Sequence, residues 1–134
     1  MGNTDAKSRS DAIAEEMEKF QGTWTVVSII RNGEKVGEAE TKNLRLVVKG
    51  DERVVKDGEE VRVKSTYKLD PSKSPKHIDL TLSEGPGAGQ TLPGIYELKD
   101  DTMKICLSLT GDRPKEFKGE EGVLLQEYKR EKKK

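Results

Sequence analysis

Few residues in this sequence combine the types and spacing that catalysis needs. His77 and Asp79 lie two positions apart in an alternating segment, so a strand would place both on one face as a possible acid–base pair. Ile78, Leu80 and Leu82 take the opposite face, which is the natural core side. His77 and Asp79 would then face solvent, without the cleft and shifted pKa of a catalytic site. We treat both as weak catalytic candidates.

The single cysteine, Cys106, is the third weak catalytic candidate. A nucleophilic cysteine needs a base nearby, and His77, the only histidine, is predicted on the corresponding outer face of another strand. A small side chain at the barrel surface or under a helix is the more common role for such a cysteine. One cysteine and one histidine cannot supply a zinc site of the usual kind or an internal disulfide. We therefore predict no metal and no cofactor.

An N-terminal helix is the first element able to position other residues. Ile13, Met17 and Phe20 recur at helical spacing and predict a helix over about residues 10–20, with Ser10 as its N-cap. Its other face, which includes Glu16, is expected to be solvated. A helix this short is not stable alone, so its apolar stripe must lie against the rest of the chain.

Short β segments make up the remainder of the chain. Residues 61–69, for example, alternate strictly between two faces, and Asn32-Gly33 is a strong hairpin signal. About eight such segments follow one another with short connections, which requires antiparallel order. Eight twisted strands with one apolar face remove their edges best by closing. We predict an all-β chain, an antiparallel up-and-down barrel with a short N-terminal helix. The alternative is a β-sandwich.

Domain organisation and charge are simple. A single domain is predicted over residues 10–130, between a flexible N-terminus (1–9) and a flexible basic tail (131–134). Lys and Arg number 25, as do Asp and Glu, so the net charge is zero and we expect no nucleic-acid partner. No long apolar segment predicts a membrane span or a signal peptide. We expect a soluble cytoplasmic protein, or a secreted or periplasmic one if an export signal has been removed.

Gly22-Thr23-Trp24, placed after the helix, resembles the Gly-x-Trp signature that opens the first strand of lipocalins and other calycins. The resemblance implies a lipocalin-like barrel in which Trp24 packs at the closed end beneath a basic residue of the last strand. Arg130, or Lys129, stands at that position. Gly22, Trp24 and Arg130 are therefore expected to be structural.

Several further blocks are similar to an uncharacterised lipocalin-like family that is abundant in planctomycete bacteria, often as a stand-alone or secreted domain. These blocks are Leu44-Arg45-Leu46, Thr66-Tyr67-Lys68-Leu69-Asp70-Pro71, Lys76-His77-Ile78-Asp79-Leu80, Gly94-Ile95-Tyr96-Glu97-Leu98, Met103-Lys104-Ile105-Cys106 and Arg113-Pro114-Lys115-Glu116-Phe117. The resemblance covers nearly the whole domain and implies a bacterial origin, but the family brings no established activity.

The barrel interior is the remaining candidate site, because an eight-stranded barrel is either filled by side chains or holds one small ligand. The residues expected to line it are Tyr67, Leu80, Tyr96 and Leu107, with Ser28 and Ser65 as small polar positions. The first hypothesis is a protein that binds an apolar or amphipathic small molecule. The second is a filled barrel that binds a protein partner of unknown kind through its surface and its 84–90 and 110–122 loops. The third is a hydrolase or isomerase at the barrel mouth.

Overall fold

The computed structural model describes residues 9–85 and 87–131, which form two helices and nine strands. Most of the flexible N-terminus predicted for residues 1–9, and of the tail predicted for 131–134, lies outside these residues. The elements are α1 (Arg9–Phe20), β1 (Gly22–Arg31), β2 (Glu34–Lys35), α2 (Glu38–Thr41), β3 (Leu44–Lys49), β4 (Glu52–Asp57), β5 (Glu60–Asp70), β6 (Lys76–Glu84), β7 (Thr91–Lys99), β8 (Thr102–Ser108) and β9 (Val123–Arg130).

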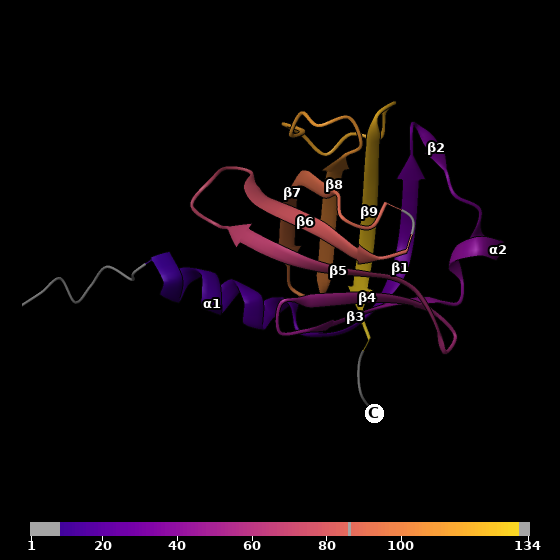
Figure 1. Cartoon of the computed structure of the whole chain (residues 1–134), viewed down its shortest axis with the longest axis horizontal. Helices are drawn as coiled ribbons and strands as arrows, with labels where there is room; N and C mark the ends of the chain where they lie inside the picture. Colours follow the sequence, from indigo (N-terminus) through magenta and orange to yellow (C-terminus); the bar gives the residue numbers. More distant parts are fainter. Residues whose placement is uncertain (1–8, 86, 132–134) are drawn as a thin grey trace, which may run out of the picture.

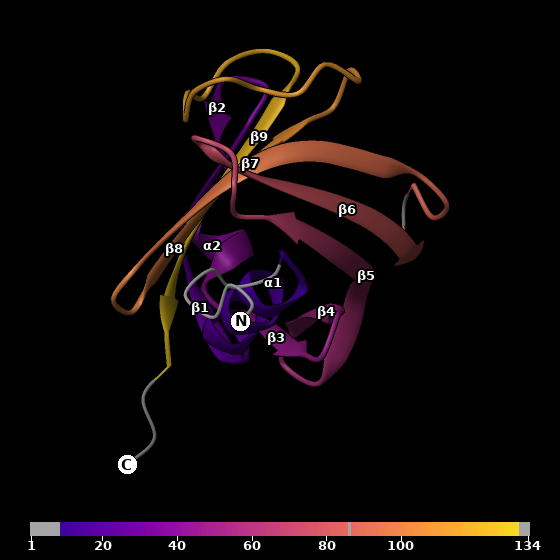
Figure 2. The ribbon, with the colours of Figure 1, turned by 90° about the vertical axis from the view of Figure 1, so that its left-hand side faces the viewer.

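The strands form a closed antiparallel barrel. Each strand from β3 to β9 pairs with the next, β3 also pairs with β1, and β1 pairs with β9 to close the ring of eight. The one remaining described strand, β2, lies in the 32–43 connection and pairs only with β1. Figures 1 and 2 show the ring from two directions. The predicted up-and-down barrel with an N-terminal helix is confirmed, and closure excludes the sandwich alternative.

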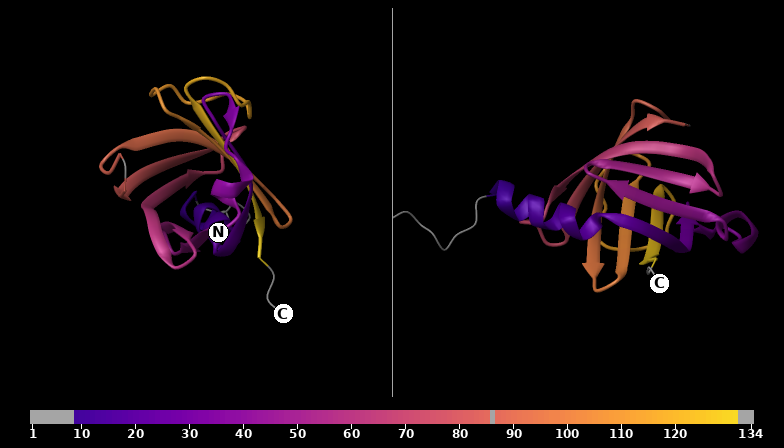
Figure 3. Two further views of the ribbon diagram at one scale, coloured as in Figure 1. Left: turned by 90° about the vertical axis from the view of Figure 1, so that its right-hand side faces the viewer. Right: turned by 90° about the horizontal axis from the view of Figure 1, so that it is seen from below.

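Helix α1 covers one end of this barrel. In Figure 2 it lies inside the curve of β1, β3, β4 and β5, and the right-hand view of Figure 3 shows it running toward the strands from one side. Its apolar stripe ends in Phe20, which is buried in the core. We call this the closed end. The opposite end, which carries the 32–43 and 109–122 connections, is called the open end.

The inward faces of the strands form one hydrophobic core. Its buried members are Phe20, Trp24, Leu46, Val48, Tyr67, Leu69, Ile78, Leu80, Tyr96, Met103, Ile105, Leu107 and Tyr128. A second, smaller cluster of Ile95, Cys106 and Val123 lies on the outer face, where the long β8–β9 connection covers it with Phe117. The alternation of apolar residues therefore distinguishes two buried surfaces, one on each side of the sheet.

A bulge in β1 changes which residues face inward. Val26 is opposite Tyr128, a core residue, whereas Ser28 is opposite Glu127, so one extra residue is inserted at Val27. An insertion of this kind reverses the alternation beyond it. Ser28 therefore lies on the outer face, and its predicted inward position is wrong.

Candidate functional site

The closed end is built from stacked aromatic rings. Phe20 of α1 stacks on Tyr67 with ring centroids 5.2 Å apart and meets Tyr96 edge-on at the same separation. Trp24 lies beside them, and its indole nitrogen donates to the Phe20 carbonyl oxygen at 3.0 Å. Offset and edge-on pairs of this kind stabilise a core beyond the area that they bury. The helix is thus fixed to the barrel through its last residue.

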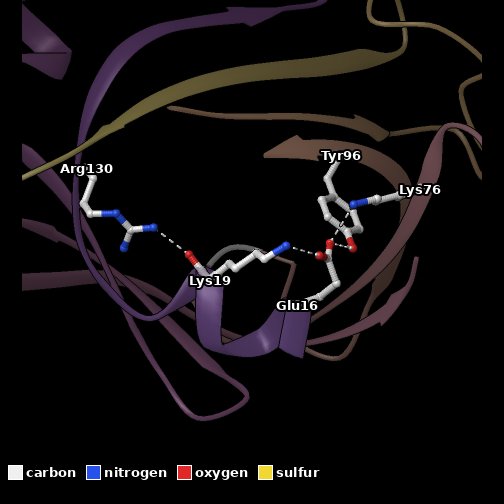
Figure 4. A network of polar contacts seen from close by, with 5 residues as sticks. All are labelled: Glu16, Lys19, Lys76, Tyr96 and Arg130. Carbon is white, nitrogen blue, oxygen red and sulfur yellow. Dashed lines mark hydrogen bonds and ion pairs between the residues drawn. The ribbon is translucent and has the colours of Figure 1, made fainter. Parts of the chain in front are cut away.

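Arg130 seals the same end from the last strand. Its guanidinium lies 4.2 Å from the centroid of the Trp24 ring, within cation–π range. It also donates to the carbonyl oxygens of Lys19 and Gln21, each at 2.7 Å, and Figure 4 shows the contact with Lys19. The last backbone carbonyl groups of a helix have no hydrogen-bond donor within the helix. Arg130 supplies the donors for two carbonyls at and just beyond the end of α1. A positive charge there also suits the helix dipole.

Glu16 joins the helix to the barrel through a buried charge. Its carboxylate accepts from the Tyr96 hydroxyl at 2.7 Å, from Lys76 at 3.1 Å and from Lys19 at 3.3 Å (Figure 4). The expected solvation of Glu16 is wrong, because the residue is only 5% exposed. Burial alone would raise the pKa of Glu16, but Tyr96 and the two lysines together hold the pKa below its ordinary value.

The hydroxyls of Tyr67 and Tyr96 serve the closed end. Tyr67 donates to the Gly50 carbonyl oxygen at 2.7 Å and lies 3.3 Å from the Gln21 amide nitrogen. Burial raises the pKa of Tyr67 to about 12. The pKa of Tyr96 is raised by burial and by its bond to Glu16. Both groups were predicted as ligand anchors, and in the structure their hydroxyls bond to the helix and to the neighbouring turn.

Two polar side chains inside the barrel keep polar atoms without partners among the described residues, although Arg53 is also hydrogen-bonded to the Tyr128 side chain. Arg53 on β4 is opposite Val48 and Ser65 in the register, so it projects into the interior, where it is 3% exposed. Its Nε and Nη2 atoms are buried and donate to no atom in the described part of the chain. Gln126, opposite Ile105, also faces inward, and its Oε1 atom has no donor there. Neither residue was identified from the sequence.

Toward the open end the inward face becomes partly exposed. Leu80 and Leu107, which were predicted to line a ligand site, are buried, and Ser65 lies buried on the same inward face. Leu82, Leu92 and Leu124, which stand at the open ends of their strands, are packed against the core but only partly buried. Two surface hollows, of about 220 and 310 Å³, lie beside the 73–76 turn and along α1, and neither is lined by Arg53 or Gln126.

The three weak catalytic candidates lie on the outer face and are not assembled into a site. Asp79 forms an ion pair with Arg113 at 2.8 Å. Burial and the Arg113 charge lower the pKa of His77. In the register, Ile95 stands between His77 and Cys106, which are therefore about 10 Å apart across two strand spacings. The distance is too great for a hydrogen bond between them.

Cys106 itself is covered. Its thiol lies 3.6 Å from the Glu116 carbonyl oxygen, beneath the β8–β9 connection, and burial raises its pKa. A thiol with a raised pKa and no access to solvent is a poor nucleophile. Within residues 9–85 and 87–131, no group of three or more His, Cys, Asp or Glu side chains is placed to hold a metal ion.

Comparisons with protein-family models, curated proteins and solved structures found no match to this chain. Among the described helices, none is long and apolar enough to cross a membrane. The candidate site therefore rests on the geometry of the barrel alone.

Proposed function

We propose that this chain is a lipocalin-like binding protein whose barrel takes an apolar or amphipathic small molecule at the open end. One observation carries the proposal. At the closed end Phe20 and Trp24 are completely buried, with Met17 and Leu98 partly buried at its margin, whereas Leu82, Leu92 and Leu124 leave the inward face partly exposed at the open end. Ligand sites are typically lined by apolar side chains with a few polar groups among them. The open end supplies the apolar lining, and Arg53 and Gln126 supply the polar groups.

Membership of the lipocalin-like family, and the bacterial origin that it implies, form part of the same proposal. The position of Arg130 over Trp24 supports it, since that contact is what the Gly-x-Trp resemblance implies. Trp24 and Arg130 then have structural roles, and Leu80, Leu107 and Ser65 line the deeper part of the site. We do not propose a hydrolase or isomerase, because His77, Asp79 and Cys106 are not brought together.

Titration with N-phenyl-1-naphthylamine, a neutral fluorescent probe, tests this function. We expect saturable one-to-one binding and, in native mass spectra, any co-purified ligand as a discrete added mass. Leu92→Glu places a charge in the open end and should abolish binding. Val27→Glu is the matched control, because Val27 is 52% exposed on the bulge of β1. An unliganded mass with no saturable binding would refute the proposal and favour a filled barrel that binds a protein partner through loops such as 110–122.

A further inference from the structure

Arg53 carries a positive charge that is buried inside the barrel. No carboxylate in the described part of the chain forms an ion pair with it, and two of its donor atoms are unused. An arginine keeps its positive charge, and burying a charge without a partner is costly. By contrast, the buried Glu16 has three donors. The fold therefore satisfies the charge of Glu16 fully, and that of Arg53 only in part, through the Tyr128 side chain.

The two unused atoms lie on one edge of the guanidinium. Nε and Nη2 each direct an N–H from that edge, and the pair of parallel donors matches the two oxygens of a carboxylate. A single water or carbonyl oxygen can accept from both donors only through two bent hydrogen bonds, whereas a carboxylate gives each donor its own oxygen. The geometry of the unsatisfied donors thus suits a planar ligand with two oxygens and a negative charge.

The surroundings of Arg53 add further hydrogen-bonding groups. Ser65 is its neighbour across the β4–β5 ladder, on the same inward face. The Tyr128 hydroxyl lies close to the guanidinium, whose positive charge opposes the rise in the pKa of Tyr128 that burial causes. Gln126 is the next inward-facing residue along β9. Hydroxyls and a guanidinium gathered inside an apolar barrel can hold a charged head group while the walls contact an apolar chain.

We infer that Arg53 is the carboxylate-binding residue of this barrel and that its ligand is an amphipathic carboxylate. The inference rests on the proposed function and specifies its ligand class. The carboxylate binds the Nε–Nη2 edge of Arg53 in the interior, beside Ser65 and Tyr128. The apolar chain extends toward Leu82, Leu92 and Leu124 at the open end.

Isothermal titration calorimetry with two matched series tests the inference. One series is the straight-chain carboxylates from butanoate to dodecanoate, and the other is the primary alcohols of the same lengths. The wild-type protein should bind each carboxylate about tenfold to a hundredfold more tightly than its alcohol, as expected for charge-assisted hydrogen bonds. Arg53→Met should remove that preference. Arg62→Met makes the same charge change at an exposed position of β5 and should retain it.

The outcomes separate the inference from the proposed function. Equal affinity for acids and alcohols, or a preference that survives in Arg53→Met, would overturn the carboxylate assignment while leaving a ligand-binding barrel. No saturable binding of either series to the wild type would overturn both.

If Arg53→Met does not fold, Arg53→Lys provides the same test, because lysine keeps the charge but lacks the paired donor edge. It should lose most of the preference, and an unchanged preference would count against the inference.

Discussion

The two ends of the barrel use the same strands and the same alternating pattern, yet they differ in burial and in polar partners. At the closed end, the side chains of Phe20 and Trp24 are completely buried, and the hydroxyls of Tyr67 and Tyr96 have partners. At the open end, Leu82, Leu92 and Leu124 are only partly buried, although Leu80 and Leu107 beside them are buried. The difference arises because one helix covers one end. The interior is mostly apolar from one end to the other, but α1 covers only one of the two ends.

The contrast teaches where function can lie. Polar groups at the closed end bond to α1. Arg130 donates to its terminal carbonyls, and Glu16 of α1 accepts from Tyr96 and Lys76. Inside the barrel, Arg53, which follows the 50–51 turn, and Gln126 carry unused hydrogen-bonding atoms. Unsatisfied buried polar groups are uncommon in folded proteins and call for an explanation. The ligand that we propose to enter from the open end would give these atoms partners.

The largest expected effect is at the closed end. Trp24→Ala removes a fully buried ring together with its contacts to Arg130 and Phe20, and it should lower the free energy of unfolding by about 3–5 kcal/mol. Urea denaturation followed by circular dichroism measures the loss. A cost below about 1 kcal/mol, which is typical of surface positions, would show that this end is not the sealed one.

Glu16→Gln should have an intermediate effect. The glutamine keeps the size of the side chain but loses the charge that Lys76 and Tyr96 satisfy, at a cost of about 1–2 kcal/mol at pH 7. Because the folded-state pKa of Glu16 lies below its ordinary value of 4.5, its contribution is complete above that pH and is lost as the pH falls through the folded-state value. The stability difference between wild type and variant should therefore shrink below about pH 4.5.

Denaturation of both proteins at a series of pH values measures this dependence. Lys19→Met is the control, because Lys19 is largely exposed and its ion pair with Glu16 should contribute under about 1 kcal/mol. A difference that stays constant from pH 7 to pH 3 would show that Glu16 is not held ionised in the folded state.

The sequence was sufficient for the barrel and for the strand faces, because the alternation of residues such as those at 61–69 is strict. It was insufficient where a single residue breaks the pattern. The bulge at Val27 has no marker such as glycine, so Ser28 was assigned to the wrong face. Glu16 lies on a charged helix face, and its burial depends on Lys76 and Tyr96, which are distant in the sequence.

Arg53 was missed for a related reason. It precedes two valines, Val54 and Val55, so either face of β4 could have been the apolar one. The missing information is the register of the β3–β4 hairpin, which sets Arg53 opposite the buried Val48. The Gly50-Asp51 turn could have predicted this register. A two-residue hairpin at that turn places residues 48 and 53 opposite each other. Site residues that depend on register are thus harder to recognise than the strands that bear them.

The smallest change in stability is expected at the open end. Leu92→Ala shortens a side chain that is already partly exposed, so the free energy of unfolding should fall by only about 1 kcal/mol, well below the cost of Trp24→Ala.

The effect of Leu92→Ala on ligand binding should be larger for long carboxylates than for short ones, because only a long apolar chain extends from Arg53 to Leu92. Each lost methylene contact should weaken binding about fourfold. Calorimetry with the same carboxylate series measures this length dependence. A stability loss equal to that of Trp24→Ala would contradict the distinction between the two ends, and equal weakening for butanoate and dodecanoate would place the chain of the ligand elsewhere.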